Sequence, residues 1–201
     1  MHLVSLTAIR AGSEAYAKER GTRGAATLLK SNVKIDRGTV TLTFKAKGGK
    51  PVSKEVRDKR LARTVTRLMA LPGRRLFQYR DVDGALRQVR AQEVNDFLRA
   101  TAGRRISLKD FRTLVASAGA LEALTAAEPA SSERARRSQI RSVVTAVAEE
   151  LSNTPTICRK SYVHDSVVEA FEDGKLSRIK PSRSMAKNVE LLARIVSKTA
   201  A

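Results

Sequence analysis

The chain has 201 residues (22.0 kDa), which is enough for one large domain or two small ones, and 39 Lys and Arg against 20 Asp and Glu give it a net charge of +19. This charge, with a pI near 10.9, indicates a polyanionic partner, while a hydrophobic content of 42% argues against disorder. Two histidines and one cysteine exclude a Cys/His zinc site and a disulfide framework, and the sequence shows no apolar run typical of a membrane span or a signal peptide.

The first part of the chain changes from helical to alternating hydrophobic spacing. Residues 1–20 carry apolar side chains near helical spacing and are expected to form one helix. Within residues 33–56, apolar and polar side chains alternate from Thr39 to Lys45, which is typical of a strand with one buried face. Glycine-containing turns flank this strand on both sides, so a three-stranded antiparallel sheet is predicted.

The rest of the chain is predicted to be mainly helical. A helix is expected from Ser53 to the Pro72-Gly73 pair, a hairpin within residues 76–90, and a surface loop over residues 128–138. Further helices are expected at residues 93–101, 107–126, 139–151, 160–172 and 185–198. The fold class is therefore mainly α with a small three-stranded antiparallel β-sheet.

The composition also narrows the kind of polyanion. Aromatic residues make up only 4% of the chain and tryptophan is absent, which disfavours a single-strand binder that stacks bases on aromatic rings. A protein that binds the backbone of a duplex needs only lysines, arginines and helix ends. The sequence therefore favours a duplex binder in a reducing compartment that contains nucleic acid.

Cleavage of a nucleic-acid strand without a metal requires a nucleophile, cations that hold the phosphate and an acid for the leaving oxygen. A tyrosine suits the first role because it forms a covalent phosphodiester that conserves the energy of the bond. Of the three tyrosines, Tyr16, Tyr79 and Tyr162, the last follows a polar and basic segment. The alternative interpretation is a surface tyrosine on a basic helix.

Tyr162 lies seven residues after the triplet Asn153-Thr154-Pro155, and this arrangement resembles the nucleophile segment of the type IB DNA topoisomerases, in their small bacterial and poxvirus-type branch. Other segments, in the family's order, resemble its remaining motifs. They are Arg10–Glu14 (first arginine motif), Phe44–Lys50 (strand and turn of the catalytic lysine, with Ala46 where a glycine is usual), the connecting segments 71–79 and 94–98, and Lys109–Thr113 (second arginine motif).

The resemblance implies a role for each matching residue. Tyr162 would attack a DNA phosphodiester and form a 3′-phosphotyrosyl link. Arg10 and Arg112 would hold the non-bridging oxygens, since guanidinium is planar, always charged and bidentate. Lys47 would protonate the departing 5′ oxygen. Asn153 would donate a hydrogen bond to a phosphate oxygen at a position where many relatives have histidine.

Lys109, three residues before Arg112, is a further candidate phosphate contact. The resemblance implies the fold of the tyrosine recombinase and type IB topoisomerase catalytic domain, as a single domain over residues 1–201 with the nucleophile in segment 139–201. The family's N-terminal DNA-clamp domain is expected to be absent from the chain. The implied activity is relaxation of supercoiled duplex DNA by a monomer in the cytoplasm, associated with the nucleoid, without a membrane, metal, nucleotide or other cofactor.

Two other functions remain open at this point. A tyrosine recombinase shares the catalytic plan, although its usual His-x-x-Arg and Leu-Gly-His motifs are Lys109-x-x-Arg112 and Leu151-Ser152-Asn153 here. A non-catalytic basic DNA-binding domain would explain the charge, with the arginines as ordinary backbone contacts. Alanine at Arg10, Lys47 or Arg112 is expected to slow the implied reaction by orders of magnitude with little loss of folding.

Overall fold

The computed structural model describes residues 1–199, and these form two compact units, one from Met1 to Phe111 and one that begins at Arg112. The boundary falls inside helix α5 (Leu108–Thr125). The sequence analysis expected one domain over this length. The predicted fold class is confirmed, since the described chain is mainly helical and contains a three-stranded antiparallel sheet.

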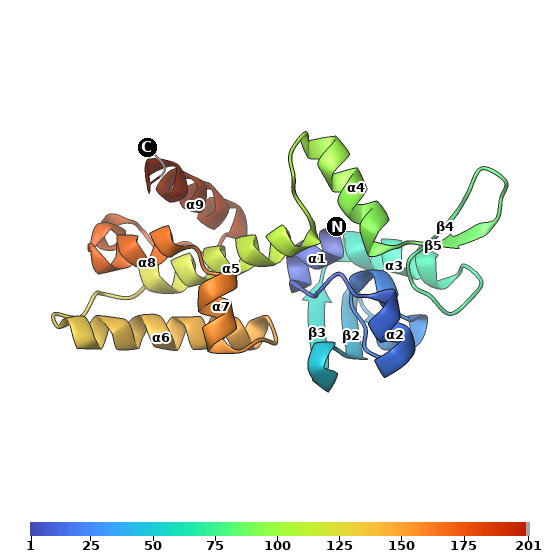
Figure 1. Cartoon of the computed structure of the whole chain (residues 1–201), viewed down its shortest axis with the longest axis horizontal. Coiled ribbons are helices and arrows are strands. Elements are labelled where there is room, and N and C mark those ends of the chain that lie inside the picture. The colour runs from blue at the N-terminus through green and yellow to red at the C-terminus, as the bar shows by residue number, and fades with distance from the viewer. Residues whose placement is uncertain (200–201) are drawn as a thin grey trace. The chain divides into compact units, whose positions relative to one another are not determined.

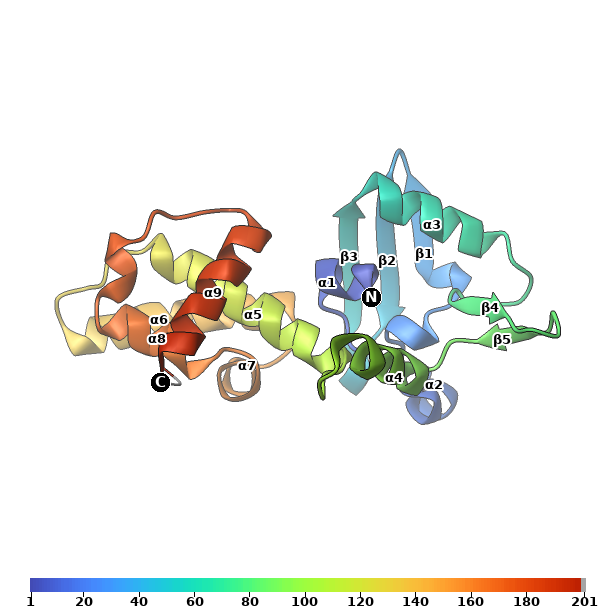
Figure 2. The ribbon, with the colours of Figure 1, turned by 90° about the horizontal axis from the view of Figure 1, so that it is seen from above.

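The sheet of the first unit consists of β1 (Val33–Asp36), β2 (Thr39–Lys45) and β3 (Pro51–Arg57), in the order β1-β2-β3 (Figure 2). Both pairings are antiparallel, and Val40 of β2 lies opposite a residue of each neighbouring strand. Buried and exposed residues alternate along β2, so that Leu42 and its apolar neighbours face the core while the threonines and Lys45 face outward.

Two expected helices of this unit differ from the observed elements. The expected helix over residues 1–20 is two helices. The first ends at Thr7, because Ala8 adopts a left-handed conformation (φ 50°). The expected start at Ser53 is also wrong. Pairing with β2 keeps the chain extended to Arg57, and Asp58 then caps the helix by accepting from Leu61 N (2.7 Å).

The remaining elements are α1 (His2–Thr7), α2 (Glu14–Arg20), η1 (Ala25–Thr27), η2 (Lys30–Asn32), η3 (Lys47–Gly49), α3 (Lys59–Met69), the predicted hairpin β4 (Gln78–Arg80) and β5 (Leu86–Gln88), and α4 (Ala91–Ala102).

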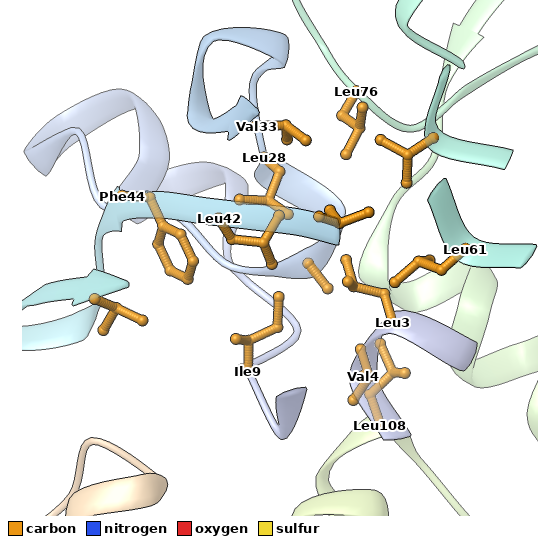
Figure 3. Close-up of a cluster of buried hydrophobic side chains, with 14 of the residues drawn as sticks. Leu3, Val4, Ile9, Leu28, Val33, Leu42, Phe44, Leu61, Leu76 and Leu108 are labelled. Carbon is orange, nitrogen blue, oxygen red and sulfur yellow. The ribbon is translucent and has the colours of Figure 1, made fainter. Parts of the chain in front are cut away.

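One cluster of buried apolar side chains holds the first unit together (Figure 3). It combines the inward face of β2 with Leu3 of α1, Leu61 of α3 and Leu76 from the segment before the hairpin. Full burial of a leucine contributes about 1.5–3 kcal/mol. The cluster therefore fixes the sheet, and with it the turns at the ends of its strands, relative to the first residues of the chain.

The second unit consists of helices, with α5 running through it in both views (Figures 1 and 2). The middle of α5 buries small side chains, including Ala116, Ser117 and Ala120, and such small side chains let neighbouring helices approach closely. Three polar residues along α5, Arg112, Ser117 and Glu122, each bond to a different part of the unit. The other elements are α6 (Glu133–Glu150), α7 (Pro155–Ser161), α8 (Asp165–Glu172), η4 (Lys175–Arg178) and α9 (Met185–Thr199).

Two boundaries in this unit differ from the prediction. The loop expected over residues 128–138 stops at Ser132, whose hydroxyl accepts from Ala135 N (3.3 Å) and so caps α6 at Glu133. The single helix expected over 160–172 is two helices, with a break between Ser161 and Asp165. No helix within residues 1–199 combines the length and apolarity that crossing a bilayer would require.

Candidate active site

Tyr162 lies at the break between α7 and α8, directly after the last residue of α7. Its N–H donates to Cys158 O (2.9 Å), which completes the final turn, and the N–H of Val163 donates to the same carbonyl (3.1 Å). The side chain is half-buried. The chain thus leaves helical geometry at the residue whose hydroxyl the sequence analysis assigned as the nucleophile.

A buried serine of α5 holds the backbone on both sides of this break. Ser117 is 1% exposed, and its hydroxyl donates to Tyr162 O (2.9 Å) and accepts from His164 N (3.0 Å). One hydroxyl therefore satisfies an acceptor and a donor that the end of α7 would otherwise leave without partners. Sequence analysis missed this residue, because its partners are backbone atoms 45 and 47 positions away, which no local pattern reveals.

Replacing Ser117 by alanine is expected to lower the free energy of unfolding by about 1–3 kcal/mol, because a carbonyl and an N–H would lose their partner in a buried setting. Urea unfolding followed by circular dichroism measures the change. Ser142→Ala, at an exposed site in the middle of α6, is the matched control and is expected to leave stability nearly unchanged. Equal stabilities of the two variants would contradict the bridging role of Ser117.

Arg112 lies almost wholly inside the second unit, at 3% exposure. Its Nη2 donates to Leu151 O (3.0 Å) at the end of α6, and its Cζ stands 5.0 Å from the centre of the Tyr162 ring. A guanidinium over an aromatic ring is attracted by the negative face of that ring. The arginine is therefore fixed both to the segment before Asn153 and to the candidate nucleophile.

The end of α6 positions Asn153 by a Schellman motif. Ser152 takes the left-handed conformation (φ 50°), its N–H donates to Glu149 O (2.9 Å), and Asn153 N donates to Ala148 O (2.8 Å). Thr154 then caps α7 by accepting from Ile157 N (3.3 Å), with Pro155 in the first helical position, where its missing N–H costs nothing. The Ser-Asn-Thr-Pro sequence thus ends one helix and begins the next within four residues.

The side chain of Asn153 has one amide group that the protein leaves unused. Its Oδ1 accepts from Thr154 N (3.0 Å), which fixes the orientation of the amide. Its Nδ2 is buried and has no hydrogen-bond partner among residues 1–199. A buried donor without a partner costs about 1–3 kcal/mol, so its presence calls for an explanation such as a ligand that accepts from it.

Two neighbours of Tyr162 have structural roles. Cys158 is fully buried, and burial raises the pKa of its thiol, against a smaller lowering by the Arg112 charge. This agrees with a packing residue rather than a reactive thiol. The imidazole Nδ1 of His164 accepts from Ser166 N (3.3 Å) and so caps α8, which gives this histidine a structural function.

In the first unit, two glycines let the backbone near Arg10 cross the segment that follows α2. Ala25 N donates to Arg10 O (2.8 Å), and a Cβ on Gly24 would stand only 2.5 Å from that same oxygen. Gly12, at φ +92°, faces Thr27 Oγ1, which a Cβ would approach to 2.6 Å. The crossing thus requires glycine at both positions and anchors the backbone that carries the half-buried Arg10.

Lys47 opens η3, the exposed turn after β2. Gly48 within this turn has φ +77°, a conformation that glycine adopts without strain. Arg23 N donates to Lys45 O (2.7 Å) at the end of β2, so the segment after α2 is hydrogen-bonded both to the Arg10 backbone and to the strand that leads to Lys47. Lys45 and Lys50 are exposed as well, so exposure does not single out one lysine.

The predicted residues thus fall into two groups. Arg10, Lys47 and the exposed Lys109 belong to the first unit, while Arg112, Asn153 and Tyr162 belong to the second. Within the second unit, Arg112 contacts the Tyr162 ring and the carbonyl of Leu151, two residues before Asn153. Within residues 1–199, no three His, Cys, Asp or Glu side chains gather in a way that would hold a metal ion. The second group has the parts that attack on a phosphate requires, namely a hydroxyl, a fixed guanidinium and an amide donor.

Comparison with known proteins gives two matches. The family described as the catalytic core of eukaryotic DNA topoisomerase I matches residues 1–189. A DNA topoisomerase 1B of Acanthamoeba polyphaga mimivirus is 30% identical over 172 residues, which cover 82% of this chain and 51% of the viral protein. The chain therefore spans about half the length of this curated relative.

Proposed function

Because this chain belongs to the type IB DNA topoisomerase family, we propose that it relaxes supercoiled duplex DNA by transient cleavage of one strand. The cleaved strand stays attached as a 3′-phosphotyrosyl ester of Tyr162. The duplex swivels about the intact strand, and the free 5′ hydroxyl then attacks the ester and reseals the break. Torsion in the DNA drives the swivelling, so the reaction consumes no nucleotide.

The observation that carries this proposal is the arrangement of Tyr162, Arg112 and Asn153. The guanidinium of Arg112 lies 5.0 Å from the Tyr162 ring centre, and the buried Nδ2 of Asn153 is a donor without a protein partner. An oxyanion is a strong acceptor for such a donor, and a fixed guanidinium stabilises the charge that builds up on phosphate oxygens. Asparagine cannot transfer a proton, so its proposed role is purely electrostatic.

The residues of the first unit complete the proposed chemistry. Tyr162 Oη forms the new bond to phosphorus and gives its proton to water. The bond to the 5′ oxygen breaks, and Lys47 supplies the proton that this oxygen takes up. Arg10 and Arg112 bind the non-bridging oxygens, and the exposed Lys109 adds a further positive charge on α5. One chain contains one of each group, so we propose that it acts as a monomer, with the nucleoid DNA as its partner.

Incubation with negatively supercoiled plasmid in EDTA and without ATP tests the function. We expect relaxed topoisomers on an agarose gel, and a protein–DNA adduct when SDS stops the reaction. Digestion of the trapped adduct identifies which end of the strand carries the protein, and a 3′ linkage is expected. A matched reaction with the Tyr162→Phe variant controls for contaminating nucleases and topoisomerases.

Adduct formation on a short duplex distinguishes a chain that cleaves DNA but holds it too weakly to relax a plasmid from a chain that does not cleave DNA. A duplex that is pre-nicked close to the cleavage position traps the covalent complex, because the short released strand diffuses away. An adduct there without plasmid relaxation would support the chemistry and contradict processive relaxation by this chain. Binding without adduct on either substrate would contradict the enzyme and leave a basic DNA-binding protein.

A further inference from the structure

A hollow of about 670 Å³ in the first unit is lined by four cationic side chains and one carboxylate. It lies between α2 and the segment that precedes the β4–β5 hairpin, and none of the five residues assigned to the reaction lines it. The charged lining residues are Glu14, Lys18, Arg23, Arg74 and Arg75. Four positive charges against one negative charge in a single hollow indicate a binding site for an anion rather than only the general basicity of the protein.

The segment that presents Arg74 and Arg75 is held rigidly. Gln78 is buried, and its Nε2 donates to Pro72 O (2.9 Å) and to Arg75 O (2.7 Å). The backbone is tied on its other side too, since Lys30 N donates to Arg74 O (3.0 Å). Both arginines therefore project from a braced loop, which lowers the entropy lost when they bind a ligand.

The three arginines differ in how far their guanidinium groups are used in contacts within the protein. Arg75, whose side chain is 12% exposed, pairs with Glu14, and its Nη1 donates to Ala26 O (3.4 Å). The side chains of Arg23 and Arg74 form no hydrogen bond or ion pair within the described residues 1–199. The single carboxylate is thus committed to one arginine, and the other two keep their donors available.

Burial and the neighbouring arginines both disfavour the positive charge of Arg23. Burial, followed by the charge of Arg75, lowers the pKa of Arg23, while Glu14 raises it and Arg74 lowers it further. An arginine stays protonated nevertheless, so the mutual repulsion remains as a cost that a bound anion would remove.

We propose that the hollow binds one phosphate of the DNA backbone through the forked donors of Arg23 and Arg74, with Arg75 as a fixed positive charge behind them. Guanidinium matches the geometry of phosphate oxygens and binds them bidentately. This inference rests on the proposed action on duplex DNA. It adds a binding site at a phosphate other than the one that is cleaved.

The test compares Arg23→Gln with Arg99→Gln. Arg99 is an exposed arginine of α4 that pairs with Asp96 (2.9 Å), so its removal controls for the loss of one charge. Binding of the full chain to a fluorescent 24-base-pair duplex is measured by anisotropy at several salt concentrations. For Arg23→Gln we expect roughly three- to tenfold weaker binding and a fall of about 0.9 in the slope of log K against log salt, as for one lost phosphate contact.

The double variant with Arg74→Gln is expected to weaken binding further without a second full loss of slope, since both arginines hold one phosphate. Identical affinities and slopes for Arg23→Gln and Arg99→Gln would overturn the proposal. A thermal stabilisation by inorganic phosphate that Arg23→Gln abolishes, with no change in DNA binding, would assign the hollow to free phosphate and overturn it as well.

Covalent capture by the unmodified chain, measured in parallel, separates this inference from the proposed function. If the adduct forms and the Arg23→Gln slope is unchanged, only the backbone site is wrong. If no adduct forms but the slope falls, the backbone site stands and the proposed reaction is wrong. Thermal unfolding of each variant verifies that it is folded at the assay temperature.

Discussion

Tyr162→Phe is expected to abolish covalent capture of DNA completely while leaving duplex binding within about twofold of the unmodified chain. The substitution removes the one oxygen that would attack phosphorus and keeps the ring that lies 5.0 Å from the Arg112 guanidinium. It also keeps the backbone bonds of residue 162 to Cys158 and Ser117. The adduct is measured on denaturing gels with a labelled duplex, and binding by anisotropy.

The other two tyrosines are the natural controls for this experiment. Tyr79 is exposed and its hydroxyl bonds to Glu93 (3.3 Å), while Tyr16 is exposed beside Arg20. Their phenylalanine variants are expected to form the adduct at the rate of the unmodified chain. Adduct formation by Tyr162→Phe, or its loss in Tyr16→Phe alone, would assign the nucleophile to another residue.

The sequence predicts those parts of the fold that depend on local patterns. Alternation along β2 predicts the sheet, because one face of the strand packs into the core and the other meets solvent. The same reasoning fails at Val56, where apolar spacing continues into α3 but pairing with Val40 keeps the residue in β3. Tertiary pairing there outweighs a helical pattern, although Asp58 marks the true start of the helix.

The site shows the same division between local motifs and distant contacts. The Thr-Pro pair and Tyr162 are visible in the sequence, and the N-terminal capping of α7 follows from the Thr-Pro pair. The contacts from α5 are not visible, since Arg112 reaches Leu151 and Ser117 reaches Tyr162 only through the folding of the second unit. Motifs therefore predict which residues act, while the packing of α5 determines how they are held.

Arg112→Lys is expected to slow formation of the covalent complex by about two to three orders of magnitude, the cost of removing one preorganised donor at a developing oxyanion. Lysine keeps the positive charge but lacks the planar fork, and one ammonium cannot replace the guanidinium that both bonds to Leu151 O and presents further donors. Single-turnover capture on the pre-nicked duplex measures the rate. Arg141→Lys, at an exposed site on α6, is the matched control and should react normally.

The structure changes what to expect of the alanine variant. The sequence analysis expected little loss of folding from Arg112→Ala, but a side chain at 3% exposure that bonds to Leu151 O contributes to stability. Loss of a hydrogen bond to a charged group costs about 1.5–3 kcal/mol, so this variant is expected to unfold at lower urea concentration. A slow reaction of Arg112→Ala alone would therefore have two explanations, loss of the catalytic cation and loss of structure around Tyr162.

Added guanidinium ion separates these two explanations. In Arg112→Ala the missing side chain leaves a space beside the Tyr162 ring that a small planar cation fits, and recovery of capture at millimolar concentration would show that the cation itself is required. Methylammonium at the same ionic strength is the control, because it supplies charge without the fork. A folded Arg112→Lys variant that reacts at the normal rate would contradict the proposed role of Arg112, since that role requires the planar pair of guanidinium donors and not the charge alone.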